Sequence, residues 1–234
     1  MLVEPPEKEV RLEKAPLPPN KWDYQTFKEY LLAQARGREF LLPLNEFPRE
    51  IEFFEDWHRT FNRMRDATEQ DDIERVALVG YRLKQRAIYL PNEHVVARTA
   101  RKFERGGYRP VDPILTLIQQ LSSFAEGLDD SIGILHSHPI EKVFGLRLFG
   151  GRLSAGDLHI VLRSACGSMI GVADGRVNSI AFKTRESVVP GDPQDKFYDL
   201  WEKEPQPQKL DELLAQKYNI ALYKGAINGV LKRV

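Results

Sequence analysis

Two histidines that follow an apolar run have the clearest chemical potential in this chain. The segment 131–139 reads SIGILHSHP, so that His136 and His138 come directly after small and apolar side chains. Such a run is typical of a sheet strand that is covered on both faces. Because residues two apart in a strand point to the same side, we expect both imidazoles on one side of a strand end, with Ser137 directed away.

A carboxylate that can complete a metal site follows further along. Catalytic zinc is held by three protein ligands, and two histidines with one carboxylate form a common set. Asp157 lies 19 positions after His138 (157 − 138), at the start of the run DLHIVL. We expect Asp157 to be the third ligand. The fourth position then holds a water, whose pKa zinc lowers to roughly 7.

The other reactive side chains have simpler interpretations. Cys166 stands among small and apolar residues, as structural cysteines do, which argues against a thiol nucleophile. His159 follows Asp157 by two on a predicted helix and therefore points elsewhere. His58 and His94 are predicted to be ordinary helix and loop residues.

The composition describes a folded protein without a strong electrostatic field. The 234 residues are 42% hydrophobic and 29% charged, enough to bury a full core. The 34 basic and 34 acidic residues cancel, so neither nucleic acid nor a membrane surface is an expected partner. A single cysteine favours a reducing, cytoplasmic location. No segment resembles a secretory signal or the roughly 20 apolar residues of a membrane helix.

The first third of the chain is predicted to be mainly helical. The proline-rich segment 1–19 is expected to be a disordered tail. Asn20 is predicted to cap a first helix that ends near Gly37. A second helix, with an aromatic stripe that should pack on the main sheet, is predicted from Pro48 to about Ala67.

Alternating strand and helix patterns follow. Strands at 76–81 and 86–90 are predicted to form a hairpin. A helix is predicted at 113–128 and the histidine strand at 132–135. Residues 143–153 form either a loop or a small hairpin.

The last part of the chain begins with a helix capped by Ser154, which runs to about Arg163 and carries Asp157 at its third position. Residues 168–182 are predicted to form a hairpin that turns at Asp174-Gly175. Further helices are predicted at 195–203 and 210–218.

These residues resemble the pattern of the JAMM (MPN/JAB) metalloprotease family, of the prokaryotic type. That pattern is a glutamate on an early strand, then His-x-His-Pro, then Ser-x-x-Asp at the start of a helix. It falls here on Glu74 in ERVALVG, on His136 and His138 in HSHP, and on Ser154 and Asp157 in SAGD. The order of the predicted elements also matches.

The resemblance covers residues 48–184 and implies an α/β (α+β) fold, in which a mixed, largely antiparallel sheet is flanked by helices, as in cytidine deaminases. The metalloprotease domain would then occupy 48–184. The remaining segments are the tail at 1–19, an N-terminal helical extension at 20–47 and a C-terminal helical extension at 185–234.

The resemblance also implies roles for the motif residues. The implied zinc ligands are His136, His138 and Asp157. Glu74 would be the general base and Ser154 would donate to the oxyanion. Glu93 is a rival base, but it lies beyond the proline that ends its strand. The implied reaction cuts an amide bond at the Gly-Gly tail of a ubiquitin-like or sulfur-carrier protein. The segment 143–153 offers an edge strand for such a tail.

The chain departs from the family pattern in the length of one spacer, and this departure leaves alternatives open. The family's spacer between the second histidine and the aspartate is roughly half as long as the spacer here, so residues between them are either an inserted loop or a sign of lost chemistry. We prefer the insertion, because Gly145, Gly150 and Gly151 permit it. A non-catalytic MPN-type scaffold is the second hypothesis. A nucleobase deaminase is a weaker third, because its Cys-x-x-Cys pair is absent. The sequence selects neither one substrate nor an oligomeric state.

Overall fold

The computed structural model describes residues 20–34, 41–71, 73–82, 84–90, 94–95, 130–138, 141–143, 146–148, 153–163, 168–189, 200 and 206–234. The predicted tail at 1–19 and the predicted helix at 113–128 lie outside these residues. So does the predicted helix at 195–203, apart from Leu200.

A mixed ten-stranded sheet forms the centre of the protein. Nine strands follow the order β1-β2-β12-β11-β10-β9-β6-β3-β4, and β5 also pairs with β3. The strands are β1 (Lys21–Trp22), β2 (Glu50–Ile51), β3 (Arg75–Arg82), β4 (Ala87–Tyr89), β5 (His94–Val95), β6 (Asp130–Ser137), β9 (Met169–Asp174), β10 (Val177–Lys183), β11 (Ile220–Ala226) and β12 (Leu231–Arg233). The pairs β1–β2 and β6–β9 are parallel, and the others are antiparallel. The prediction of a mixed, largely antiparallel sheet is confirmed.

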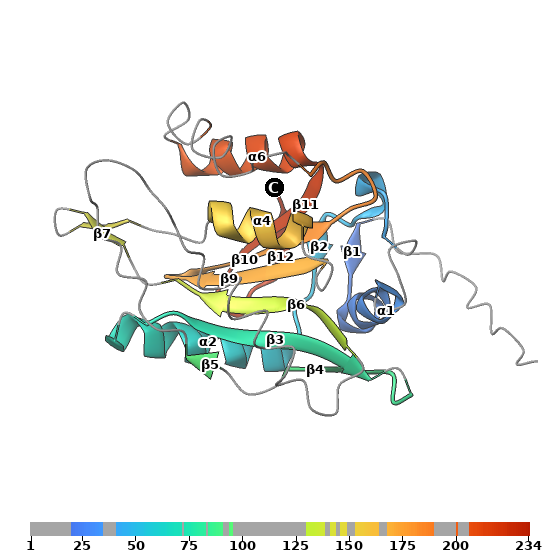
Figure 1. The fold of residues 1–234 in the computed structure, drawn as a ribbon, viewed down its shortest axis with the longest axis horizontal. Coiled ribbons are helices and arrows are strands. Elements are labelled where there is room, and N and C mark those ends of the chain that lie inside the picture. Colours follow the sequence, from blue (N-terminus) through green and yellow to red (C-terminus); the bar gives the residue numbers. More distant parts are fainter. Residues whose placement is uncertain are drawn as a thin grey trace, which may run out of the picture.

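Helices cover both faces of this sheet. They are α1 (Tyr24–Gln34), α2 (Glu55–Asp71), α4 (Ala155–Arg163) and α6 (Pro207–Tyr218), with a short 3₁₀ helix, η2 (Leu44–Glu46). In Figure 1, α4 and α6 lie over one face, and α2 lies on the other. Strands β7 (Glu141–Val143) and β8 (Leu146–Leu148) form a separate two-stranded hairpin, one of the two forms expected for this segment. Across the described ranges, none of the helices combines the length and apolarity that crossing a bilayer requires.

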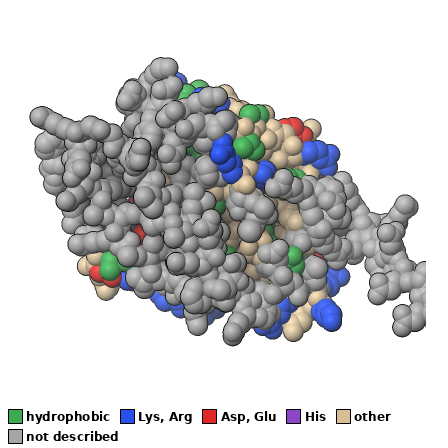
Figure 2. All heavy atoms as spheres, in the orientation of Figure 1, with side chains coloured by type: hydrophobic (Ala, Val, Ile, Leu, Met, Phe, Trp, Pro, Cys, Tyr) green, Lys and Arg blue, Asp and Glu red, His purple; other side chains and the backbone are tan. Residues whose placement is uncertain are grey.

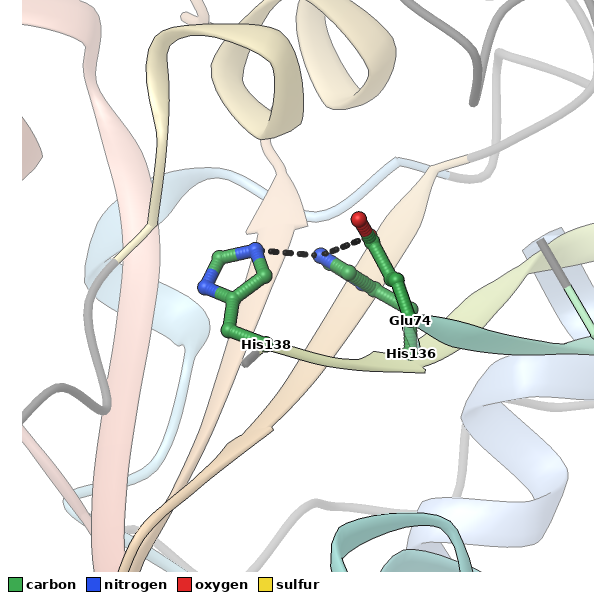
Figure 3. Close-up of side chains that lie close together, drawn as sticks. All are labelled: Glu74, His136 and His138. Atoms are coloured by element: carbon green, nitrogen blue, oxygen red, sulfur yellow. Dashed lines mark hydrogen bonds and ion pairs between the residues drawn. The ribbon is translucent and has the colours of Figure 1, made fainter. Parts of the chain in front are cut away.

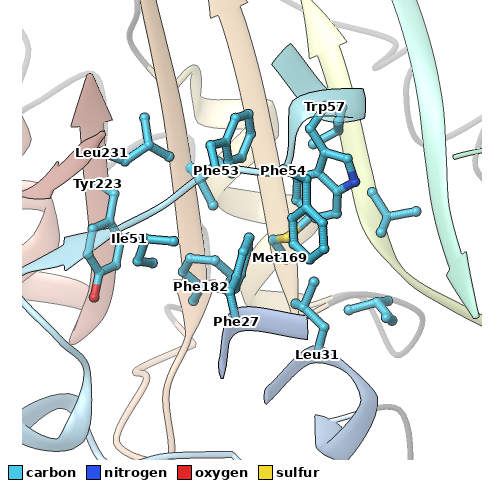
Figure 4. Packing of buried hydrophobic residues seen from close by; sticks show 14 of the residues in the cluster. Phe27, Leu31, Ile51, Phe53, Phe54, Trp57, Met169, Phe182, Tyr223 and Leu231 are labelled. Carbon is cyan, nitrogen blue, oxygen red and sulfur yellow. The ribbon is translucent and has the colours of Figure 1, made fainter. Parts of the chain in front are cut away.

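Two apolar clusters hold these layers together. An aromatic cluster joins α1 and α2 to the sheet, with the ring of Phe27 centred 5.5 Å from that of Trp57 and 5.7 Å from that of Phe182 (Figure 4). It confirms the predicted packing of the aromatic stripe of α2, which buries Trp57, Phe61 and Met64. A second, mainly aliphatic cluster joins α4 and α6 to the opposite face.

One face of the protein carries side chains of both charges. On the face drawn in Figure 2, the described side chains include basic, acidic and hydrophobic groups, with the basic groups at several separate places.

The N-terminal boundaries differ from the prediction. Asn20 does not cap α1, because residues 21–22 pair with β2 and bury Trp22. The cap is Asp23, whose Oδ1 accepts a hydrogen bond of 2.8 Å from the backbone N–H of Thr26. The second helix begins at Glu55 and not at Pro48, since residues 50–51 lie between β1 and β12 as a strand.

The C-terminal segment is also more than helical. The predicted helix at 210–218 is confirmed as α6, but β11 and β12 follow it and extend the central sheet. Asn219 ends α6 in the left-handed conformation with a φ of 50°, which turns the chain into β11. The predicted hairpin of β9 and β10 is confirmed, although Asp174 pairs with Val177 and the turn is therefore Gly175-Arg176.

Two glycines allow the layers to approach closely, and they yield a stability prediction. A Cβ at Gly171 would lie 2.6 Å from Leu135 Cδ2 and 2.8 Å from Phe61 Cζ, whereas a Cβ at Gly133 would overlap the backbone oxygen of Met169. Gly171→Ala should cost about 1–3 kcal/mol of unfolding free energy, as overpacking generally does. Gly133→Ala should cost more, because a neighbouring backbone yields less than side-chain ends. Denaturant unfolding measures both, and the reverse ranking would contradict this packing.

Candidate metal centre

The ends of two neighbouring strands bring the predicted site residues together. In the antiparallel pair of β3 and β6, Val76 lies opposite His136. Side chains two apart share a face, so Glu74, two before Val76, and His138, two after His136, lie on the face that α4 covers. Figure 3 shows these three side chains pointing toward one another from the start of β3 and the end of β6.

The distances define a compact cluster of donor atoms. Nε2 of His136 lies 3.0 Å from Nε2 of His138 and 3.8 Å from Oε1 of Glu74. Ligand atoms of Glu74, His136 and His138 all lie within 4.8 Å of one another, so this group can hold a metal ion. The His136 side chain is fully buried, and that of Glu74 is 9% exposed.

Helix α4 supplies a second carboxylate to the same point. Oδ1 of Asp157 lies 2.9 Å from Nε2 of His136, and Oδ2 lies 3.5 Å from Nε2 of His138. The 19-residue spacer therefore does not separate Asp157 from the histidines. The hairpin of β7 and β8 lies within this spacer, as an insertion would.

The first turn of α4 fixes the orientation of Asp157. The backbone N–H of Asp157 donates to Oγ of Ser154 at 3.2 Å, and the backbone N–H of Ser154 donates to Oδ2 of Asp157 at 2.6 Å. This reciprocal pair is a capping box, with aspartate in the position usually held by glutamate. The predicted cap is therefore confirmed, and one carboxylate both caps the helix and faces the histidines.

Burial and charge oppose each other at the centre of the cluster. Burial on its own would lower the pKa of His136, but the Asp157 carboxylate raises it to about 9, with a smaller contribution from Glu74. Burial would raise the pKa of Asp157, yet His136 and then His138 lower it to about 2. The interaction between the Asp157 carboxylate and the His136 imidazole therefore outweighs the effect of burial on the pKa of both side chains.

The donor spacing fits a tetrahedral ion. Ligand atoms about 2.0–2.1 Å from zinc lie about 3.3 Å apart at the corners of a tetrahedron. The two Nε2 atoms of His136 and His138 are 3.0 Å apart, close to this value, and each has one oxygen of Asp157 at a similar distance, Oδ1 at 2.9 Å from His136 and Oδ2 at 3.5 Å from His138. Two imidazole nitrogens 3.0 Å apart beside a buried carboxylate also form the kind of polar cluster that a shared cation satisfies.

Of the other candidates, the structure describes the side chain of His58 alone. His58 is on α2, and its ring is centred 4.8 Å from that of Phe53 and packs against it, as predicted for a helix residue. Glu93 and Cys166 lie outside the described residues, as do the side chains of His94 and His159. A cavity of about 960 Å³ between α1, α2 and β4 is lined by none of the residues of the cluster.

The sequence did not predict the polar contact on the opposite face of the sheet from this cluster. There, Oγ1 of Thr68 on α2 lies 2.6 Å from Oγ of Ser137. Ser137 was expected to point away from the histidines, but nothing in the sequence indicated its partner. The only available signal was a threonine at a buried position of the helix.

Comparison of the chain with known protein families, with curated proteins and with solved structures gives no match.

The cluster predicts a metal site that one substitution removes. His136→Ala should weaken Zn²⁺ binding by more than about 100-fold, because even groups that only support a ligand cost 10- to 100-fold when lost. Isothermal titration of the chelator-treated protein measures this change. The matched control is His58→Ala, which removes a histidine from α2 and should leave binding unchanged. Equal binding by wild type and His136→Ala would place the metal elsewhere.

Proposed function

We propose that this chain is a zinc-dependent metallopeptidase of the JAMM type, which hydrolyses an amide bond at the C-terminal tail of a ubiquitin-like or sulfur-carrier protein. One observation carries the proposal: two imidazoles and two carboxylates converge at the adjoining ends of β3 and β6 and the start of α4. The His-x-His-Pro and Ser-x-x-Asp motifs supply three of these four groups.

The two carboxylates have different positions, which supports different roles. Asp157 reaches both histidines, with its oxygens at 2.9 and 3.5 Å, and is the better third ligand. Glu74 approaches His136 at only 3.8 Å, from the neighbouring strand. A group beside the ligands, within reach of a water in the open position, is placed as a general base.

The chemistry divides between the metal and the chain. Zinc held by His136, His138 and Asp157 would lower the pKa of a bound water to about 7 and polarise the substrate carbonyl. Glu74 takes a proton from the attacking water and delivers it to the leaving amine. Its low exposure favours this transfer, because solvent does not compete for the proton.

Ser154 is suited to bind the oxyanion. Its hydroxyl oxygen accepts the N–H of Asp157, while the hydroxyl hydrogen remains available for a second interaction. That hydrogen can donate to the negative oxygen of the tetrahedral intermediate. Groups in this role typically contribute about 10²- to 10³-fold to kcat.

If Glu74 is the general base and not a ligand, its substitution should abolish activity without removing the metal. Glu74→Gln should keep zinc and lose about 10²- to 10⁴-fold in kcat, because the amide cannot accept the proton. A ubiquitin-like domain joined through its Gly-Gly tail to a reporter amine is the substrate. Zinc content is measured in the same preparation.

The control Glu69→Gln changes an exposed glutamate on α2 and should leave both quantities unaltered. Undiminished activity in Glu74→Gln would remove Glu74 from its role. A zinc-free wild type without activity would instead favour the scaffold hypothesis.

The hairpin of β7 and β8 offers a docking edge for the substrate tail. It is a two-stranded sheet within the spacer between the histidines and Asp157, and an extended tail can add to such a sheet as a third strand. Deletion of Phe144 to Phe149 should therefore raise KM for the tailed substrate about 10-fold or more, the loss expected when several backbone hydrogen bonds disappear. It should change KM little for a short amide without the tail, and an unaltered KM for the tailed substrate would exclude this role.

A further inference from the structure

A hydrogen-bonded network lies behind the cluster, on the opposite face of the sheet. Arg75 and Ser137 alternate with Glu74 and His136 along their strands, so their side chains point toward α2. Thr68 and Ser137 are 1% and 0% exposed. Polar groups buried this deeply are costly unless they are hydrogen-bonded, and these two are paired with each other.

The network begins where the ladder between β3 and β6 stops. The last paired residues are Val76 and His136. Beyond them, the backbone N–H of Arg75 donates to Oγ of Ser137 at 3.2 Å, so a side chain replaces the next ladder acceptor. On the other edge of β6, the N–H of His138 still donates to the carbonyl of Ala173 at 3.1 Å. The histidine strand is therefore held by β9, whereas Arg75, which follows Glu74, is held by Ser137 on one edge of β3 and by β5 on the other.

The direction of the hydrogen bonds follows from the number of hydroxyl protons. Thr68 donates its only hydroxyl hydrogen to the carbonyl of Ile73, at 2.7 Å. Ser137 must then donate to Oγ1 of Thr68, at 2.6 Å, while accepting from Arg75. One chain of hydrogen bonds thus runs from the backbone N–H of Arg75, through the hydroxyls of Ser137 and Thr68, to the carbonyl of Ile73. It joins the residue after Glu74 to the residue before it.

The Arg75 side chain closes the same network. Its Nη1 donates to Oγ1 of Thr68 at 3.2 Å and to the carbonyl of Ile73 at 2.8 Å. Its Nη2 donates to Oδ2 of Asp71 at 2.7 Å. Helix α2 therefore holds the carbonyl that precedes Glu74 directly, through Thr68, and the N–H that follows Glu74 indirectly, through Thr68 and Ser137.

We propose that Thr68, acting through Ser137 and the backbone of Ile73 and Arg75, is a positioning residue that holds the Glu74 carboxylate beside the metal. The role rests on the proposed function of Glu74 as general base. Positional error is expensive for such a group, because a misplacement of about 1 Å can cost about 10²-fold in rate. The metal ligands have supports other than Thr68, since Asp157 is held in the first turn of α4 and both histidines are held along β9.

The test uses binding of acetohydroxamate to the cobalt-loaded protein, followed by visible absorption. Acetohydroxamate is added as the neutral hydroxamic acid, which gives its hydroxyl proton to an adjacent carboxylate and then binds the metal through two oxygens. Glu74→Gln measures how much acetohydroxamate binding weakens when that carboxylate is lost, and the other variants are compared with it. Thr68→Val should bind cobalt like wild type but bind acetohydroxamate about 10-fold more weakly, the lower end of the loss that removal of a supporting group causes. Because Glu74 acts in the chemical step, kcat should fall with KM unchanged. Thr68→Ser retains the hydroxyl and should restore both.

The matched control is Thr60→Val, the same change eight positions earlier on α2 (68 − 60), which should behave like wild type. If Thr68→Val does not fold, Asp71→Asn loosens the exposed end of the network and should weaken acetohydroxamate binding in the same direction. Normal acetohydroxamate binding by the folded Thr68 or Asp71 variant, with Glu74→Gln weakened, would overturn the positioning role alone. A wild type that binds no cobalt, or a Glu74→Gln variant that binds acetohydroxamate normally, would refute the proposed function and with it the role of Thr68.

Discussion

The structure depends on the antiparallel pairing of β3 and β6. Their last paired residues are Val76 and His136, so the side chains just beyond this pair emerge at one strand end. Alternation along both strands sends Glu74, His136 and His138 toward α4, while Arg75 and Ser137 face α2. A shift of β6 by one residue in this register would turn His136 and His138 toward α2 and leave Glu74 on the side of α4, which would separate the histidines from both carboxylates.

The buried charge of Asp157 explains why so much structure surrounds this point. A fully buried carboxylate is unfavourable unless it is paired and hydrogen-bonded. The backbone of Ser154 and both imidazoles provide those partners. The same contacts pre-arrange three donors for a cation, and the low-dielectric surroundings strengthen its attraction to the carboxylates. Helix capping and the stabilisation of a buried charge therefore depend on one set of contacts.

The parts of the fold with strong periodic patterns could be predicted from the sequence. The hairpin of β3 and β4, the histidine strand and helices α4 and α6 all lie where their apolar spacing indicated. The two-residue strands β1 and β2 could not be predicted, because so short a segment has no period and is extended only through its partners. Strands β11 and β12 were missed, although Asn219 marks the turn between α6 and β11.

The candidate site also combines features that a local sequence pattern predicts with features that depend on the tertiary fold. The spacing of His136 and His138 is enough to place both imidazoles on one side of a strand. The distance of 3.5 Å between Asp157 Oδ2 and His138 Nε2 could not be predicted in this way, because the length of a 19-residue spacer does not determine how far apart its ends lie in the folded protein. The contact between Thr68 and Ser137 depends on where α2 crosses the sheet, which no local pattern encodes.

X-ray absorption at the zinc edge of the zinc-loaded protein tests the central claim most directly. The account predicts four nitrogen or oxygen neighbours at about 2.0–2.1 Å, with the multiple scattering of two imidazole rings. A sulfur neighbour at about 2.3 Å, or a shell without imidazole, would contradict it.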